Sequence, residues 1–188
     1  MDTTNSAQRP FRSGLTAALA CTVVLATGSA HANDAGGARL DQLPQHWLDE
    51  QAQALSLRDL IGHRVILSMA YTRCHRTCPT TISELLRLQT LLDARGEQAS
   101  FVIIGYDSED DNPASWRQYR ANRHLERSNW HFLTGTHAAV RQLARQLGFN
   151  FWIYDSHVLH DPRVVVFDAN GLLSATFSSA TGDWLARL

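Results

Sequence analysis

The chain has 188 residues, of which 44% are hydrophobic and 19% charged, and its 17 basic side chains nearly balance 18 acidic ones to give a net charge of −1. This balance argues against a protein that binds nucleic acid or an anionic membrane surface. The length suits one domain with its own hydrophobic core.

The first 32 residues have the pattern of a secretory signal peptide. Arg9 and Arg12 form a basic region, and Leu15–Thr27 is apolar and uncharged. Ala30-His31-Ala32 has the small residues that signal peptidase accepts, so we expect cleavage after Ala32 and export of the remaining chain. The alternative is an uncleaved membrane anchor, because residues 13–32 carry no charged side chain and are about as long as one membrane span.

Removal of the signal would take Cys21 with it, and residues 33–43 are then expected to be a mobile lead-in. The exported chain keeps two cysteines, Cys74 and Cys78. The compartment is oxidising, so a disulfide could form there. A disulfide between residues only four positions apart would close a very small loop and would add little to the stability of the fold. These two cysteines are therefore expected to be functional.

The rest of the chain, residues 44–188, alternates predicted strands and helices. Strands are expected at Val65–Ala70, Ala99–Gly105, Trp130–Leu133, Phe149–Tyr154, Arg163–Phe167 and Leu172–Phe177. Helices are expected at Ser56–Gly62, from Pro79 to Asp93, at Pro113–Arg123 and at His137–Leu147, with a very short one at Asp183–Leu188. This order predicts a single α/β domain of thioredoxin-like type, a sandwich with a mixed central sheet flanked by helices.

Cys74 and Cys78 are the most informative residues, because they stand between a predicted buried strand and a predicted helix. Thioredoxin-like folds display reactive sulfur in this order. The helix N-terminus at Cys78 and the neighbouring Arg73 and Arg76 favour the thiolate, which is both the nucleophile and the metal-binding form. Three residues lie between the cysteines, which leaves room for an ion, and soft thiolates favour copper. The same pair also suits redox chemistry.

A third ligand would complete a metal site, and His157 and His160 are the candidates. Both are expected in the loop before the strand at Arg163–Phe167, which faces the cysteine turn in a thioredoxin-like sheet. Two thiolates and one imidazole suit copper in either oxidation state, or zinc. The residues alone leave open which histidine binds, and whether the cysteines serve metal binding or redox chemistry.

Four elements, in order, resemble the Sco/SenC family, and they cover nearly the whole exported chain. They are Tyr71-Thr72 followed by Cys74-His-Arg-Thr-Cys78-Pro79, the loop Asp107–Pro113, the segment Trp130–Gly135, and His160 eight residues before the turn Asp168–Gly171. The cysteine motif alone is moderately specific. All four elements together make the match strong, and the family implies a thioredoxin-like domain.

The resemblance implies one copper ion held by Cys74, Cys78 and His160, with Asp107 placed to orient the histidine or a partner. It implies a periplasmic metallochaperone that helps assemble the binuclear copper site of cytochrome c oxidase. The partner would be the copper-accepting subunit of the oxidase or another cuproprotein. Some members are thought to reduce their target's cysteines instead, so the alternative is a periplasmic thiol–disulfide oxidoreductase with Cys74 and Cys78 as its catalytic pair.

Two departures from the family pattern lie beside the expected ligands. His75-Arg76 stands where the family usually has Pro-Asp, and Asp161-Pro162 stands where a small or hydroxylic residue usually follows the histidine. Pro162 resembles the cis-proline that thioredoxin-like reductases carry beside their sulfurs. A cis peptide bond at Pro162 would move the histidine loop and favour redox chemistry.

Overall fold

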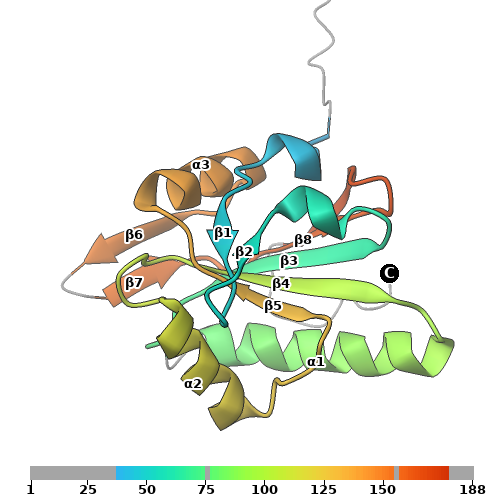
Figure 1. The fold of residues 1–188 in the computed structure, drawn as a ribbon, viewed down its shortest axis with the longest axis horizontal. Coiled ribbons are helices and arrows are strands. Elements are labelled where there is room, and N and C mark those ends of the chain that lie inside the picture. Colours follow the sequence, from blue (N-terminus) through green and yellow to red (C-terminus); the bar gives the residue numbers. More distant parts are fainter. Residues whose placement is uncertain (1–36, 75–76, 155–156, 178–188) are drawn as a thin grey trace, which may run out of the picture. The chain divides into compact units, whose positions relative to one another are not determined.

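The computed structural model describes residues 37–74, 77–154 and 157–177 (Figure 1). The expected signal peptide, the first four residues of the expected lead-in and the expected last helix lie outside these ranges, as do His75 and Arg76. Within the described ranges, no helix combines the length and the apolar character needed to cross a lipid bilayer.

The core of the domain is a mixed five-stranded sheet in the order β5-β4-β3-β8-β9 (Figure 1). Its strands are β3 (Arg64–Ala70), β4 (Ala99–Gly105), β5 (Trp130–Leu133), β8 (Val164–Phe167) and β9 (Leu173–Phe177). The three strands β3, β4 and β5 run parallel, whereas β8 and β9 are antiparallel to their neighbours. The predicted α/β class and mixed sheet are confirmed.

Three helices flank this sheet: α1 (Thr77–Arg95), α2 (Pro113–Arg123) and α3 (His137–Leu147). The crossovers containing α1 and α2 cover one face of the sheet, and α3 lies on the other face (Figure 1). The side chain of Asn112 caps α2 by accepting from Ser115 N at 3.1 Å, directly before Pro113. Gly148 ends α3 in the left-handed conformation that glycine adopts without strain.

The N-terminal part of the domain is built from short elements. The strands β1 (Trp47–Leu48) and β2 (Ala54–Leu55) form a small ribbon, and the predicted helix at Ser56–Gly62 is a single 3-10 turn, Leu57–Leu60. The structure describes residues 37–43 of the expected lead-in as part of the domain. Leu40, in a 3-10 turn, is fully buried, and its N–H donates to Gly171 O at 2.8 Å.

A second small sheet differs from the expectation. The predicted strand Phe149–Tyr154 is β6 (Phe151–Tyr154), and the segment expected to be a loop is β7 (His157–His160), which pairs antiparallel with β6. Only two residues separate these strands, and they lack the Asn-Gly or Asp-Gly signal that identifies a hairpin from sequence. His160 is therefore positioned by a strand pair, with Phe151 as its cross-strand neighbour.

Aromatic side chains fill the core between the sheet and its covering elements. The rings of Phe101 and Trp130 stack at 4.8 Å between centroids. The Trp47 ring lies so close to Gly135 that a Cβ there would overlap it. This contact gives a packing reason for the glycine of the Trp130–Gly135 motif, and it ties the β1–β2 ribbon to the segment after β5.

Candidate metal centre

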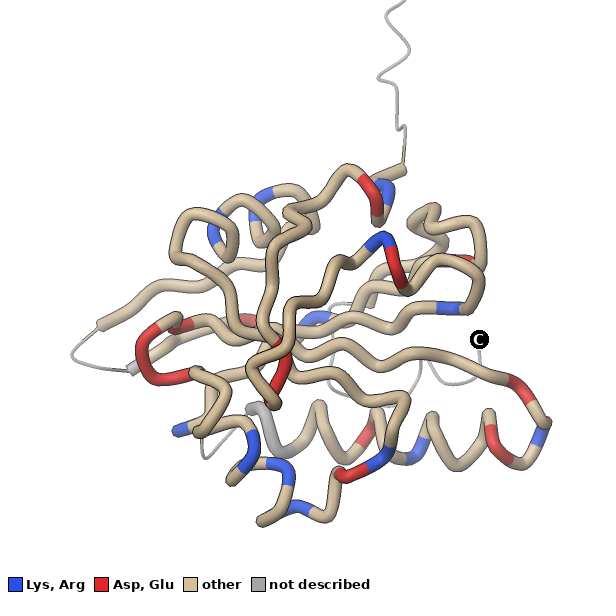
Figure 2. Tube along the Cα trace, in the orientation of Figure 1, with Lys and Arg blue, Asp and Glu red and all other residues tan. Residues whose placement is uncertain are grey.

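Three loops meet at one edge of the central sheet. Because β3 and β4 are parallel, the cysteine turn after Ala70 and the acidic loop after Gly105 leave the sheet side by side (Figure 2). Because β8 is antiparallel to β3, with Val164 opposite Ser68, the segment before β8 begins at the same edge. The topology therefore brings His160 back toward Cys74.

The side chains of Cys74 and His160 face each other, with Sγ and Nε2 3.9 Å apart. Both are partly exposed. An ion about 2.3 Å from a thiolate and about 2.0 Å from an imidazole, at an angle of about 120°, would separate the two ligand atoms by roughly 3.8 Å, using zinc distances as a guide. The observed separation therefore fits two ligands of one ion.

The His160 ring is held from two sides. It packs against the Tyr106 ring with 4.7 Å between centroids, and Tyr106 in turn packs against Phe151 at 4.9 Å. His160 Nδ1 lies 3.3 Å from Asp161 O. A proton on Nδ1 would satisfy this carbonyl and leave the lone pair of Nε2 directed toward the sulfur, the arrangement that metal-binding histidines adopt.

The strand that follows is anchored close to His160. Ser68 Oγ on β3 donates to Arg163 O at 2.7 Å, and Arg163 Nε donates to Leu147 O at 2.8 Å. The backbone has no cis peptide bond among the described residues, so the bond before Pro162 is trans. The cis-proline arrangement, on which one argument for redox chemistry depended, is therefore not present.

The two remaining ligand candidates are only partly described. Cys78 belongs by its backbone to the first turn of α1, and its side chain lies outside the described part of the structure. The His157 side chain is likewise outside it, and its backbone lies three residues from His160, about 10 Å along the strand. Among the side chains that are described, no group of three histidine, cysteine or acidic residues gathers to hold an ion.

Asp111 fixes the cysteine turn. Its fully buried carboxylate accepts from Thr72 N at 2.7 Å, from Thr72 Oγ1 at 2.8 Å and from Asp107 N at 2.9 Å. Within the turn, Cys74 N donates to Tyr71 O at 2.9 Å. Burial raises the pKa of Asp111 to about 6, although these hydrogen bonds favour the ionised form and oppose the rise.

The expected role of Asp107, to orient the histidine or a partner, stays a prediction. Asp107 Oδ1 accepts from the backbone N–H of Glu109 and of Asp110, so its recorded contacts shape its own loop. Asp111 was missed. The available signal was Gly105, because a Cβ at that position would overlap the Asp111 side chain. A glycine that ends a strand of bulky residues can indicate such a close approach.

Asp110 joins two more residues of the cysteine turn. It accepts from Tyr71 OH at 2.9 Å and pairs with Arg73 at 2.8 Å. Burial and this hydrogen bond raise the pKa of Tyr71 to about 12, so the phenol stays protonated and donates. The partly exposed guanidinium of Arg73 adds positive charge to the turn that carries Cys74, which favours its thiolate.

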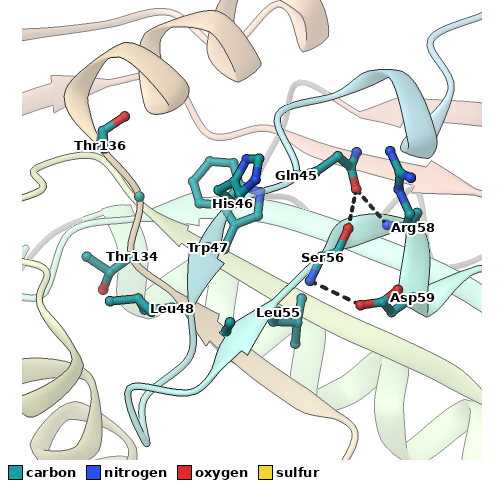
Figure 3. Close-up of a pocket in the computed structure, with 12 residues that line it drawn as sticks. Gln45, His46, Trp47, Leu48, Leu55, Ser56, Arg58, Asp59, Thr134 and Thr136 are labelled. Carbon is teal, nitrogen blue, oxygen red and sulfur yellow. Dashed lines mark hydrogen bonds between the residues drawn. The ribbon is translucent and has the colours of Figure 1, made fainter.

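A large cavity lies elsewhere. It has a volume of about 870 Å³ and lies between the β1–β2 ribbon and residues 134–136 (Figure 3). Gln45 braces its wall by accepting from Ser56 Oγ at 2.7 Å and Arg58 N at 2.9 Å. Neither Cys74 nor His160 lines it. The candidate metal centre thus lies at the sheet edge where the three loops meet, separate from this cavity.

The chain is similar in sequence and in fold to known proteins. The SCO1 protein homolog of Bacillus subtilis is 28% identical over 122 residues, which are 65% of this chain and 62% of that protein. The chain thus spans less than two thirds of the length of this relative.

Solved structures share the fold. Arabidopsis thaliana ScoI with copper bound matches with a TM-score of 0.69 and 18% identity, covering 81% of this chain and 94% of that one. BsSco, described as a member of the Sco family of cytochrome c oxidase assembly proteins with a disulfide switch, matches with a TM-score of 0.66 and 21% identity, covering 75% and 84%. The SCO1/SenC family profile matches residues 41–184. The chain belongs to the SCO1/SenC family.

Proposed function

We propose that this protein is a copper metallochaperone that holds one copper ion with Cys74, Cys78 and His160. The observation that carries the proposal is the 3.9 Å approach of Cys74 Sγ to His160 Nε2 across 86 residues of sequence. Thiolate and imidazole ligands match the preferences of copper. Cys78, four residues after Cys74 and in the first turn of α1, is the third ligand by position.

Copper is the cargo in this proposal, and release proceeds by ligand exchange. Thiolates of the acceptor replace Cys74 and Cys78 in turn while His160 dissociates, so the oxidation state of the copper is unchanged. His160 lies on a hairpin outside the central sheet and is partly exposed, which suits a ligand that must leave. We propose that Asp107 supports the site through the loop that it shapes beside Asp111.

We further propose that the client is the copper-accepting subunit of cytochrome c oxidase and that the protein acts in the periplasm. The client follows from the family, one member of which is described as a cytochrome c oxidase assembly protein. The location follows from the N-terminal sequence pattern, with a membrane-anchored form facing the periplasm as the alternative. Fractionation of cells that produce the full chain would separate the two forms.

A second function is favoured by one observation, the disulfide switch named for BsSco. In this alternative, Cys74 attacks a disulfide of the target and Cys78 resolves the mixed disulfide. The target gains two thiols while Cys74 and Cys78 become a disulfide. This chemistry requires no histidine ligand.

Oxidase assembly in a strain that lacks the protein distinguishes the two functions. Under the copper proposal, Cys74→Ser and His160→Ala both abolish the copper-dependent oxidase activity that the wild-type protein restores. Under the alternative, His160→Ala restores activity and Cys74→Ser does not. The exposed His63, before β3 and outside the centre, supplies the control His63→Ala, which restores activity in either case.

A further inference from the structure

The β6–β7 hairpin has two apolar faces with different surroundings. Side chains alternate between faces along each strand, and cross-strand partners share a face. Phe151 and His160 are partners, and both contact Tyr106, so their face is turned toward the domain. Trp152 and Leu159 are partners on the opposite face, together with Tyr154. We call Trp152, Tyr154 and Leu159 the outer face.

The outer face exposes large aromatic and aliphatic side chains of the kind that are usually buried. Trp152 is 55% exposed, Tyr154 72% and Leu159 47%. With about 150–250 Å² for each large aromatic side chain, these three residues expose roughly 350–400 Å² of mostly apolar surface. A contiguous patch of this size on a soluble domain often marks an interaction site.

The rim of the outer face is predominantly basic. Trp152 also lines a depression of about 460 Å³ together with Arg141 and Arg145 of α3, and with Asp161. Basic residues stand along α3 in Figure 2. Both arginines are exposed, and neither forms an ion pair with any residue that the structure describes. Two cations against one carboxylate would attract an acidic surface.

We propose that the outer face, with its arginine rim, is the surface on which a copper-exchanging protein docks transiently, through an apolar patch bordered by acidic residues. This inference rests on the proposed function. The outer face lies on the same hairpin as His160, and Leu159 directly precedes His160 in β7, so a protein seated there lies close to the candidate metal centre.

Two other occupants fit the observations less well. A stable dimer needs about 800 Å² from each partner, roughly twice the area of the outer face. In a two-fold contact the same patch meets itself, so the arginine rims of two copies would also oppose each other. A lipid surface would match the aromatic and basic character, but it would explain neither the position beside His160 nor any exchange of copper.

The test compares copper transfer to a protein with copper transfer to a small molecule. The full exported chain, loaded with Cu(I), is mixed with the reduced apo copper-accepting domain of the oxidase or, separately, with bathocuproine disulfonate. We expect Leu159→Ser and Tyr154→Ser each to slow transfer to the domain at least fivefold and to leave transfer to bathocuproine within twofold. Leu91→Ser is the matched control, because Leu91 is 41% exposed on α1, and it leaves both rates unchanged.

Charge reversal tests the rim. Arg141→Glu with Arg145→Glu is expected to slow transfer to the domain at low salt and to flatten its dependence on ionic strength, whereas Arg58→Glu, at an exposed arginine outside the rim, changes neither.

Each other outcome overturns a distinct statement. If the wild-type protein and the outer-face variants transfer copper to the domain at equal rates, docking at this face is overturned. It is also overturned if the wild-type protein releases copper to bathocuproine but transfers none to the domain. Binding to phosphatidylglycerol vesicles that is lost in the outer-face variants, with protein transfer unaffected, assigns the face to a membrane instead. Failure of the wild-type protein to bind copper overturns the proposed function and the inference with it.

Discussion

Asp111 illustrates how one buried carboxylate organises the cysteine turn of the candidate metal centre. Its three hydrogen bonds hold the Thr72 backbone and the start of the acidic loop. Its pKa is raised to about 6, mainly by burial. Ionising it in the folded protein therefore costs free energy, and this cost appears as a dependence of stability on pH.

The pH dependence has a definite sign. Between about pH 4 and pH 6 the folded state keeps a proton on Asp111 that the unfolded state has lost, so the free energy of unfolding falls as pH rises through this window. Asp111→Asn cannot ionise. From pH 4 to pH 7, urea denaturation should show the variant gaining about 2.4 kcal/mol relative to the wild-type protein. A difference between the two proteins that does not change with pH would contradict the assignment.

The close packing of the Asp111 side chain against β4 is expected to require a glycine at residue 105. A Cβ at residue 105 would overlap the Asp111 side chain, so Gly105→Ala should lower the free energy of unfolding by about 1–3 kcal/mol through overpacking. In the Asp111→Gly background the same change should cost much less, because the Asp111 Cβ, the nearest atom that it would overlap, is gone. A double-mutant cycle measures this coupling, and additive effects would show that the close approach is unimportant.

The β6–β7 hairpin is the element that the sequence predicted least well. His157–His160 contains one β-branched residue, Val158, and the two residues that connect it to β6 lack the usual turn signal, so the sequence favours a loop. The consequence is functional. A paired strand gives His160 a fixed neighbour and one defined face, toward Tyr106, whereas a loop would leave its direction open.

Tyr106 is therefore expected to tune copper binding through the His160 ring. Tyr106→Leu keeps a large apolar side chain but removes the ring contact, and we expect the Cu(I) affinity to fall about twofold to tenfold, in line with the 0.5–1.5 kcal/mol of an aromatic pair. Tyr106→Phe keeps the ring and should keep the affinity. Equal affinities for the Leu and Phe variants would show that the ring does not position His160.

Across the domain, the sheet topology explains why Cys74 and His160, so distant in sequence, lie close together. The parallel order of β3, β4 and β5 and the return of β8 antiparallel to β3 place the cysteine turn, the acidic loop and His160 at one edge. Most of this was predictable, because strand and helix periodicity is local. The choice of His160 and the role of Asp111 depend on contacts between segments tens of residues apart, which local patterns do not record.

The most direct test of the metal centre is an anaerobic Cu(I) titration of the reduced protein, residues 33–188, against a competing chelator. The wild-type protein is compared with His160→Ala and with the exposed-histidine control His63→Ala. We expect one tightly bound equivalent in the wild-type and His63→Ala proteins, and an affinity at least tenfold weaker in His160→Ala. Weak Cu(I) binding by the wild-type protein, or equally tight binding by the wild-type and His160→Ala proteins, would contradict the site formed by Cys74, Cys78 and His160.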